Sequence, residues 1–152
     1  MGGLVVVGFG NPLRMDDGLG PVAAKRLEAI VHDGDIRFLI RHQLGVELAE
    51  ELRDADFAIF IDAHLGDIPG TLKEESVLPG QTVSGSFSHH LSPGALLSLV
   101  QALYGRNPEA TVYSVAAGSL EHGEGFSPPV ENALPVLIEK VLERIGRVKD
   151  MK

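Results

Sequence analysis

Short apolar runs, bounded by glycine or polar residues, recur along the chain. Runs that are this short and rich in β-branched residues are typical of strands buried on both faces of a sheet. The pattern predicts strands at 4–7, 36–40, 57–61 and 111–115. We expect the strand at 57–61 to end sharply at Asp62. The more polar stretch 71–78 fits an edge strand or an excursion from the sheet.

Apolar residues at helical spacing separate these runs. After a loop rich in Gly, Asn, Pro and Asp, Pro21 suits the first turn of a helix. That helix has an apolar stripe formed by Ala23, Leu27, Ile30 and Val31. Residues 46–54 predict a short helix with Leu48 and Leu52 on one face.

Two further helices are predicted in the second half of the chain. Ser92 and Pro93 begin the first of them, and Gly105 ends it. Its inward side chains are expected to be Leu96, Leu97, Val100 and Leu103. The last helix shows the clearest 3.6-residue period, and we place its start near Asn132 so that Pro135 falls in the first turn.

Strands and helices alternate throughout the chain. This order predicts an α/β fold, a three-layer sandwich with a mostly parallel twisted sheet of about five strands flanked by helices. The sequence shows no internal repeat, linker or low-complexity tract, so residues 1–152 are predicted to form a single domain.

Composition narrows the possible chemistry. The formal net charge of −8 argues against nucleic acid or an anionic membrane as the main partner. Cysteine is absent, which excludes disulfides, thiolate nucleophiles and cysteine-ligated metals, so a metal would need His and carboxylate ligands. The apolar run at the N-terminus is too short for a signal peptide or a membrane span, and we expect a cytoplasmic protein.

Polar residues follow several predicted strands at the edge where ligands collect in such sheets. Asp16 and Asp17 lie in the loop GFGNPLRMDDGLG, and Asp62 closes the strand at 57–61. His89 and His90 precede the helix that begins at Ser92 and Pro93. Carboxylates combined with imidazole form an O/N site that suits a divalent transition metal such as nickel or zinc.

Structural roles are open for each of these residues. One acid of the Asp16–Asp17 pair could cap the following helix while the other faces the cleft. Asp62 at the end of a buried strand needs a partner to offset its desolvation, and a loop turn could supply one. The histidines could be solvated or bonded to backbone, and His64 could sit beside Asp62.

The glycine-rich loop also invites a dinucleotide-binding interpretation. Gly8 and Gly10 match the first two positions of GxGxxG, but Leu13 occupies the third. The acid expected about 20 residues further on is missing, since Arg41, His42 and Gln43 follow the second strand. A non-catalytic metal- or nucleotide-binding module on a Rossmann-like fold is therefore the weaker hypothesis.

Three segments together resemble the [NiFe]-hydrogenase maturation proteases. GFGNPLRMDDGLGP is similar to their N-terminal signature, IFIDA to their second metal-binding segment, and SFSHHLSPGALL to their third. The segments occur in the family's order over nearly the full chain, and GEGFSP before the last helix is similar too. Position by position, the resemblance implies Asp17, Asp62 and His89 as both metal ligands and catalytic residues.

The resemblance also implies a function. It predicts a cytoplasmic, monomeric hydrolase that removes the C-terminal extension of a hydrogenase large-subunit precursor after nickel insertion. Cleavage is expected after a His or Arg near the last nickel-binding cysteine motif of that precursor. Nickel would be carried by the substrate and sensed by the enzyme, and zinc or cadmium could occupy the site in vitro. Whether a metal or a carboxylate activates the water stays open.

Overall fold

The computed structural model describes residues 3–82 and 91–150. Within these residues the chain forms one five-stranded sheet with the order β2-β1-β3-β5-β4. The strands are β1 (Leu4–Phe9), β2 (Ile36–Arg41), β3 (Phe57–His64), β4 (Leu72–Val77) and β5 (Glu109–Ala116). Only the edge strand β4 is antiparallel to its neighbour, so the predicted, mostly parallel sheet is confirmed.

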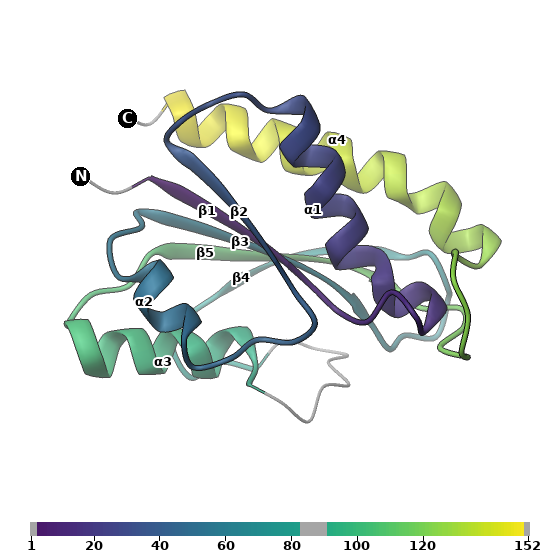
Figure 1. Ribbon diagram of the computed structural model, residues 1–152, viewed down its shortest axis with the longest axis horizontal. Coiled ribbons are helices and arrows are strands. Elements are labelled where there is room, and N and C mark those ends of the chain that lie inside the picture. The colour runs from purple at the N-terminus through teal and green to yellow at the C-terminus, as the bar shows by residue number, and fades with distance from the viewer. Residues whose placement is uncertain (1–2, 83–90, 151–152) are drawn as a thin grey trace.

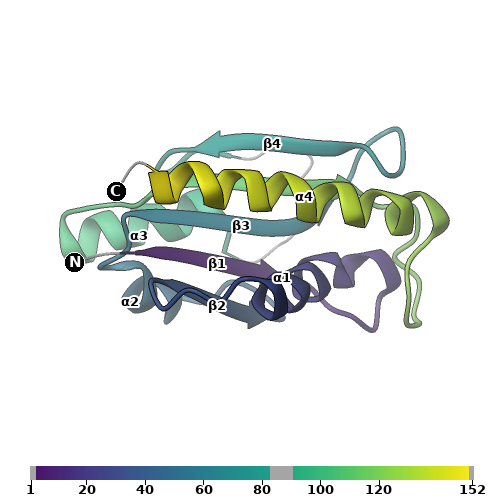
Figure 2. The same cartoon turned by 90° about the horizontal axis from the view of Figure 1, so that it is seen from above.

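Helices cover both faces of the sheet, which gives three layers (Figure 1). They are α1 (Leu19–Ile30), α2 (Leu48–Leu52), α3 (Pro93–Tyr104) and α4 (Pro128–Asp150), with a 3-10 turn η1 (Met15–Gly18) before α1. α1 and α4 lie on one face, whereas α2 and α3 lie on the other (Figures 1 and 2). None of the described helices is long and apolar enough to cross a membrane.

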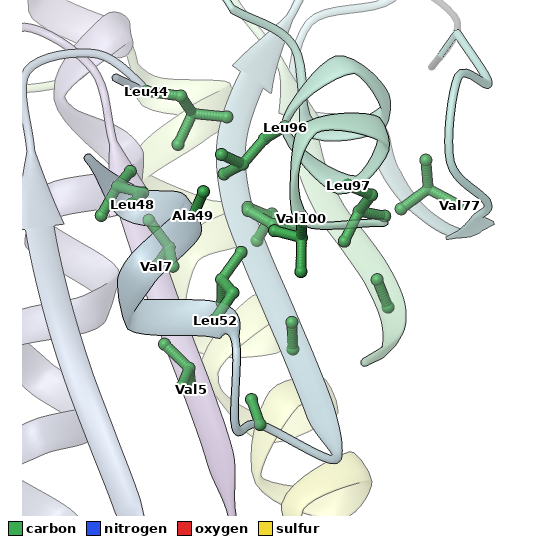
Figure 3. Packing of buried hydrophobic residues seen from close by; sticks show 14 of the residues in the cluster. Val5, Val7, Leu44, Leu48, Ala49, Leu52, Val77, Leu96, Leu97 and Val100 are labelled. Atoms are coloured by element: carbon green, nitrogen blue, oxygen red, sulfur yellow. The ribbon is translucent and has the colours of Figure 1, made fainter. Parts of the chain in front are cut away.

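Each face of the sheet has its own apolar core. On the α2/α3 face, Leu48 and Leu52 of α2 and Leu96 and Val100 of α3 pack against alternate residues of the strands (Figure 3). On the other face, α1 and α4 cover the intervening strand residues, among them Val6 and Ile61. Two buried faces explain why the strands read as continuous apolar runs rather than alternating ones.

The order of the strands places a switch point between β1 and β3. From β1 the chain moves outward to β2 and then returns to add β3 on the other side of β1. The connections that leave β1 and β3 therefore diverge, and a small cavity at this point, here called the crevice, is lined by Phe9 of β1 and Asp62 of β3. Ligands bind at such a crevice in open α/β sheets.

Four details of the sequence-based prediction are wrong. β3 continues to His64, so Asp62 lies within the strand rather than just after it. The last helix begins at Pro128, so Pro135 lies inside it and not in its first turn. Leu103 and Ile30, which were expected to face inward, are 59% and 53% exposed because each lies in the last turn of its helix, beyond the edge of the core.

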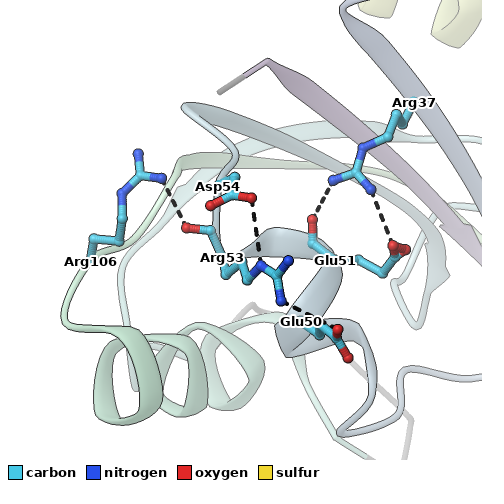
Figure 4. Close-up of polar contacts among 6 residues, drawn as sticks. All are labelled: Arg37, Glu50, Glu51, Arg53, Asp54 and Arg106. Atoms are coloured by element: carbon cyan, nitrogen blue, oxygen red, sulfur yellow. Dashed lines mark hydrogen bonds and ion pairs between the residues drawn. The ribbon is translucent and has the colours of Figure 1, made fainter. Parts of the chain in front are cut away.

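The amino edge of the sheet carries a hollow of about 310 Å³ among charged residues. These charges pair with one another: Arg37 bonds Glu51 at 3.1 Å, and Arg53 bonds Glu50 at 3.3 Å (Figure 4). Arg106 reaches the carbonyl of Arg53 at 2.8 Å. These pairs tie the residues of this edge to one another, whereas the predicted site residues Asp17 and Asp62 lie at the opposite edge.

Candidate active site

Asp62 lies just beyond the point where the pairing of β3 with β1 ends. The last residue pair between these strands is Gly8 with Ile61, so Asp62 does not pair with β1. On its other side Asp62 still pairs with Ser114 of β5. The alternation along β3 places Asp62 on the α2/α3 face, following Phe60 of that core. The sheet thus holds the carboxylate rigidly at the crevice between β1 and β3.

The surroundings of Asp62 favour its neutral form. Burial raises the pKa of this carboxyl group well above its ordinary value of 3.8, and the charge of Asp17 raises it further. A hydrogen bond of 2.8 Å from the N–H of Ala63 to Asp62 Oδ1 opposes these effects and lowers the pKa, but it does not cancel them. Asp17, predicted in the first loop, and Asp62, predicted at a strand end, are therefore close enough to interact electrostatically.

Asp17 is held in η1, which packs against β3. Its Oδ2 accepts a hydrogen bond of 2.9 Å from the N–H of Asn11, and only 9% of the residue is exposed. The side chain of Asn11 accepts in turn from the N–H of Leu13 at 3.0 Å. The asparagine of the GxGN segment thus shapes the loop, and its backbone orients the Asp17 carboxylate.

Asp16 faces away from Asp17 and is completely buried. It accepts hydrogen bonds from residues 118, 119 and 127, more than a hundred positions along the chain. The prediction that one acid of the pair caps the following helix is wrong, because no side chain caps the start of α1. The partner of Asp16 is a distant loop rather than the start of α1.

The glycines of the first loop are required by the chain's own packing. Gly10 has φ 143°, and a Cβ there would collide with the carbonyl oxygen of Asp17. A Cβ on Gly20, in the first turn of α1, would collide with the carbonyls of Phe9 and Ile61. Since these glycines let the ends of β1, β3 and α1 approach each other, they give no support to a nucleotide-binding role.

Solved structures similar to this chain cover nearly its whole length. The hydrogenase maturating endopeptidase HybD from E. coli matches with a TM-score of 0.80 and 26% identity, covering 95% of this chain and 93% of that one. The hydrogenase 2 maturation peptidase from a Thaumarchaeota archaeon matches with a TM-score of 0.67 and 25% identity, covering 95% and 98%. The [NiFe] hydrogenase maturation protease HycI from Thermococcus kodakarensis KOD1 matches with a TM-score of 0.77 and 23% identity, covering 95% and 92%.

The structure of this chain is similar over nearly its whole length to those of hydrogenase maturation peptidases. The resemblance inferred from the three segments is therefore confirmed at the level of structure. Comparison with protein-family models and with curated protein sequences gives no match. At about a quarter identity, the sequence has diverged while the fold has not.

Within this maturation-protease fold, the third predicted ligand cannot be placed. His89 and its neighbour His90 lie outside the described residues. The crevice is lined by both Asp62 and Pro93, so the first turn of α3 comes close to Asp62. His32, His42 and His122 are exposed in loops.

A buried histidine next to Asp62 was noted in the sequence but not given a role. His64 is 2% exposed, lies on the same face of β3 as Asp62, and shares a hydrogen bond of 2.8 Å between its Nδ1 and Ser114 Oγ. Burial lowers the pKa of His64, and the charge of Lys73 lowers it further, while Glu75 raises it. His64 is therefore a neutral, structurally satisfied neighbour of the acids.

The structure describes two of the three predicted metal ligands, Asp17 and Asp62. Among residues 3–82 and 91–150, no group of three ligating side chains comes together. Asp17 and Asp62 nevertheless lie close enough to interact, and a divalent cation would offset their repulsion. This donor set fits a metal that arrives with ligands of its own.

Proposed function

We propose that this protein is an endopeptidase that removes the C-terminal extension of a [NiFe]-hydrogenase large-subunit precursor. The observation that carries the proposal is the interacting pair Asp17 and Asp62 at the β1/β3 crevice of a maturation-protease fold. The named activity of the structural neighbours supports the reaction class, since HybD is described as an endopeptidase.

Asp17, Asp62 and His89 recognise nickel that the substrate already holds. Two carboxylates lack enough donors for a resident transition metal, but they can complete the coordination of a nickel ion held by substrate ligands. Ionisation of both acids in a buried crevice is unfavourable, so the incoming positive charge contributes binding free energy. A precursor without nickel offers no such contribution, which makes metal insertion a checkpoint for cleavage.

Exposed apolar side chains at the carboxyl edge of the sheet, here called the rim, support a protein substrate. Four exposed apolar side chains lie in the loops that follow β1, β2 and β3. They are Leu13 (58% exposed), Val46 (67%), Leu65 (50%) and Ile68 (71%). Exposed apolar residues that surround a polar site are typical of protein-binding surfaces. The rim can hold the folded precursor while its C-terminal segment enters the crevice.

Two routes can activate the hydrolytic water. In the first, the substrate's nickel lowers the pKa of a bound water. In the second, Asp62 accepts the proton from water, a role suited to a carboxyl group with a raised pKa. In the second route Asp62 acts as the base instead of binding nickel, so the rate of cleavage rises with pH through the pKa of Asp62, and replacing nickel with another divalent metal leaves that midpoint in place.

The decisive experiment compares nickel-loaded and nickel-free precursor as substrates for the purified protein. We expect cleavage of the loaded form only, and we expect Asp62→Asn to abolish it without unfolding the protein. Asp54→Asn is the matched control, because Asp54 is an exposed acid at the opposite edge. Equal cleavage of both precursors would refute nickel recognition, and cleavage of neither would refute the endopeptidase function.

A further inference from the structure

We propose that Asp16 is a positioning residue that fixes Asp17 by clamping the first loop to the loop 117–127. The proposal rests on the proposed function only in that Asp17 is the group being positioned. Figure 1 shows the two loops side by side at the carboxyl edge of the sheet. The clamp consists of the Asp16 carboxylate and the donors that surround it.

The carboxylate of Asp16 is saturated with donors from one distant loop. Oδ2 accepts from the N–H of Gly118 at 2.7 Å, the N–H of Ser119 at 2.8 Å and the hydroxyl of Ser127 at 2.7 Å. Oδ1 accepts from the N–H of Ser127 at 2.8 Å. All four donors are uncharged, and Asp16 is not exposed to water. The stabilisation of the buried carboxylate therefore depends on the geometry of these four hydrogen bonds.

Backbone hydrogen bonds continue the clamp on both sides of Asp16. The N–H of Asp16 donates to the carbonyl of Ser119 at 3.1 Å, and the N–H of Met15 donates to the carbonyl of Gly123 at 3.0 Å. The N–H of Gly123 returns a bond of 2.9 Å to the carbonyl of Leu13. The two loops therefore form a short two-stranded contact with Asp16 at its end.

Met15 shows that the clamp holds a conformation that the chain would otherwise avoid. Its φ is 45°, the left-handed region, although it is not glycine. Such a residue is kept there only by its surroundings. Here the surroundings are the bonds to Ser119 and Gly123, and η1 with Asp17 begins at this residue. Loss of the clamp would let Met15 relax and turn Asp17 away from Asp62.

The test replaces Asp16 with asparagine, which has the same shape. An amide offers one oxygen and one N–H₂ group, so at least one donor of the distant loop would face another donor. The position of Asp17 is read from the amide of Asn11, whose N–H donates to Asp17 Oδ2. Asp17→Ala, which removes that acceptor, gives the reference value for the free amide by NMR hydrogen exchange and chemical shift.

We expect Asp16→Asn to shift the Asn11 amide toward the Asp17→Ala value, with exchange about ten-fold faster, the size expected for a lost charge-assisted bond. Cleavage of the precursor should lose about ten-fold or more in kcat, with little change in KM, because misplacement affects the reacting geometry. Ile145→Ala is the control for a general loss of stability, since Ile145 is buried in α4 far from the crevice. It should change neither readout when both variants are folded.

Ser127→Ala removes only the hydroxyl bond and serves if Asp16→Asn fails to fold. It should move the Asn11 amide in the same direction by a smaller amount. An Asn11 amide that stays at its wild-type position in the folded variants would overturn the proposal, as would an equal shift in Ile145→Ala. Because the amide readout needs no activity, a wild-type protein that fails to cleave would refute the proposed function and leave this test valid.

Discussion

Asp17 raises the pKa of Asp62, although one residue lies in a loop after β1 and the other lies within β3. The interaction is possible because β1 and β3 are adjacent parallel strands, so their carboxyl ends meet at one edge. Burial is the larger cause of the raised pKa, and the charge of Asp17 is the part that can be removed by mutation.

Asp17→Asn should therefore lower the pKa of Asp62 without returning it to its ordinary value. The amide removes the neighbouring charge but leaves the burial, which is the first cause of the shift. A titration of the Asp carboxyl carbons by NMR measures the change. Asp54→Asn should leave the Asp62 midpoint in place, and a midpoint equally unmoved by Asp17→Asn would show that the two acids do not interact.

Asp62→Asn should stabilise the folded protein at neutral pH. A carboxyl group whose pKa is higher in the folded state contributes stability below its unfolded pKa, and this is lost as pH rises through the folded pKa. Each unit of the raised pKa corresponds to about 1.4 kcal/mol of lost stability at high pH. Asparagine does not titrate, and its oxygen can still accept from Ala63.

Urea unfolding of both proteins across the acid range checks this prediction. The advantage of Asp62→Asn should grow between the ordinary pKa of 3.8 and the folded pKa of Asp62 and then stay constant. A variant that is uniformly less stable at every pH would contradict it. A variant that is more stable but no longer cleaves shows the trade-off between stability and activity that is expected at a functional site.

Local sequence signals predicted those elements whose ends are set by residues within or next to them. Ser92 accepts from the N–H of Ala95 at 3.2 Å and begins α3 as expected, and the helix ends at Tyr104, just before Gly105. The strand boundaries were harder, since β3 runs on through Asp62 and His64 because β5 continues to pair with it there. In a sequence, a polar residue after an apolar run suggests the end of a strand, because the neighbouring strand that continues to pair with it is not visible there.

Long-range contacts were beyond the reach of the sequence. The adjacent acids Asp16 and Asp17 predicted two different roles, but nothing local identified Ser127 as the partner of Asp16. The only hint was that the segment GEGFSP, which contains Ser127, is similar to the corresponding segment of the family. The start of α4 was misplaced because Pro135 was taken as a first-turn residue. In the structure Pro128 and Pro129 occupy that turn.

Loss of an apolar side chain from the rim should weaken precursor binding and spare the chemistry. Leu13→Ser and Ile68→Ser each remove exposed apolar contact area, for which we expect a several-fold rise in KM, about 1 kcal/mol, with kcat retained. Unfolding free energies should stay within about 0.5 kcal/mol of the wild type. Leu103→Ser is the control, because Leu103 is equally exposed at the far end of α3. A KM that rises equally in the control would show that the rim does not contribute specifically to substrate binding.

Gly20→Ala should be among the most damaging single-methyl changes in the protein. The added carbon would collide with the backbone carbonyls of Phe9 and Ile61, which cannot move aside as a side chain can. We expect a loss of about 3 kcal/mol or more, together with displacement of the crevice that those carbonyls border. Gly146→Ala adds the same methyl in α4 where nothing lies within 4 Å, and it should stabilise the protein by about 0.5–1 kcal/mol. Urea unfolding of the two variants measures both effects, and a Gly20→Ala protein as stable as the wild type would show that α1 does not need its close approach to β1 and β3.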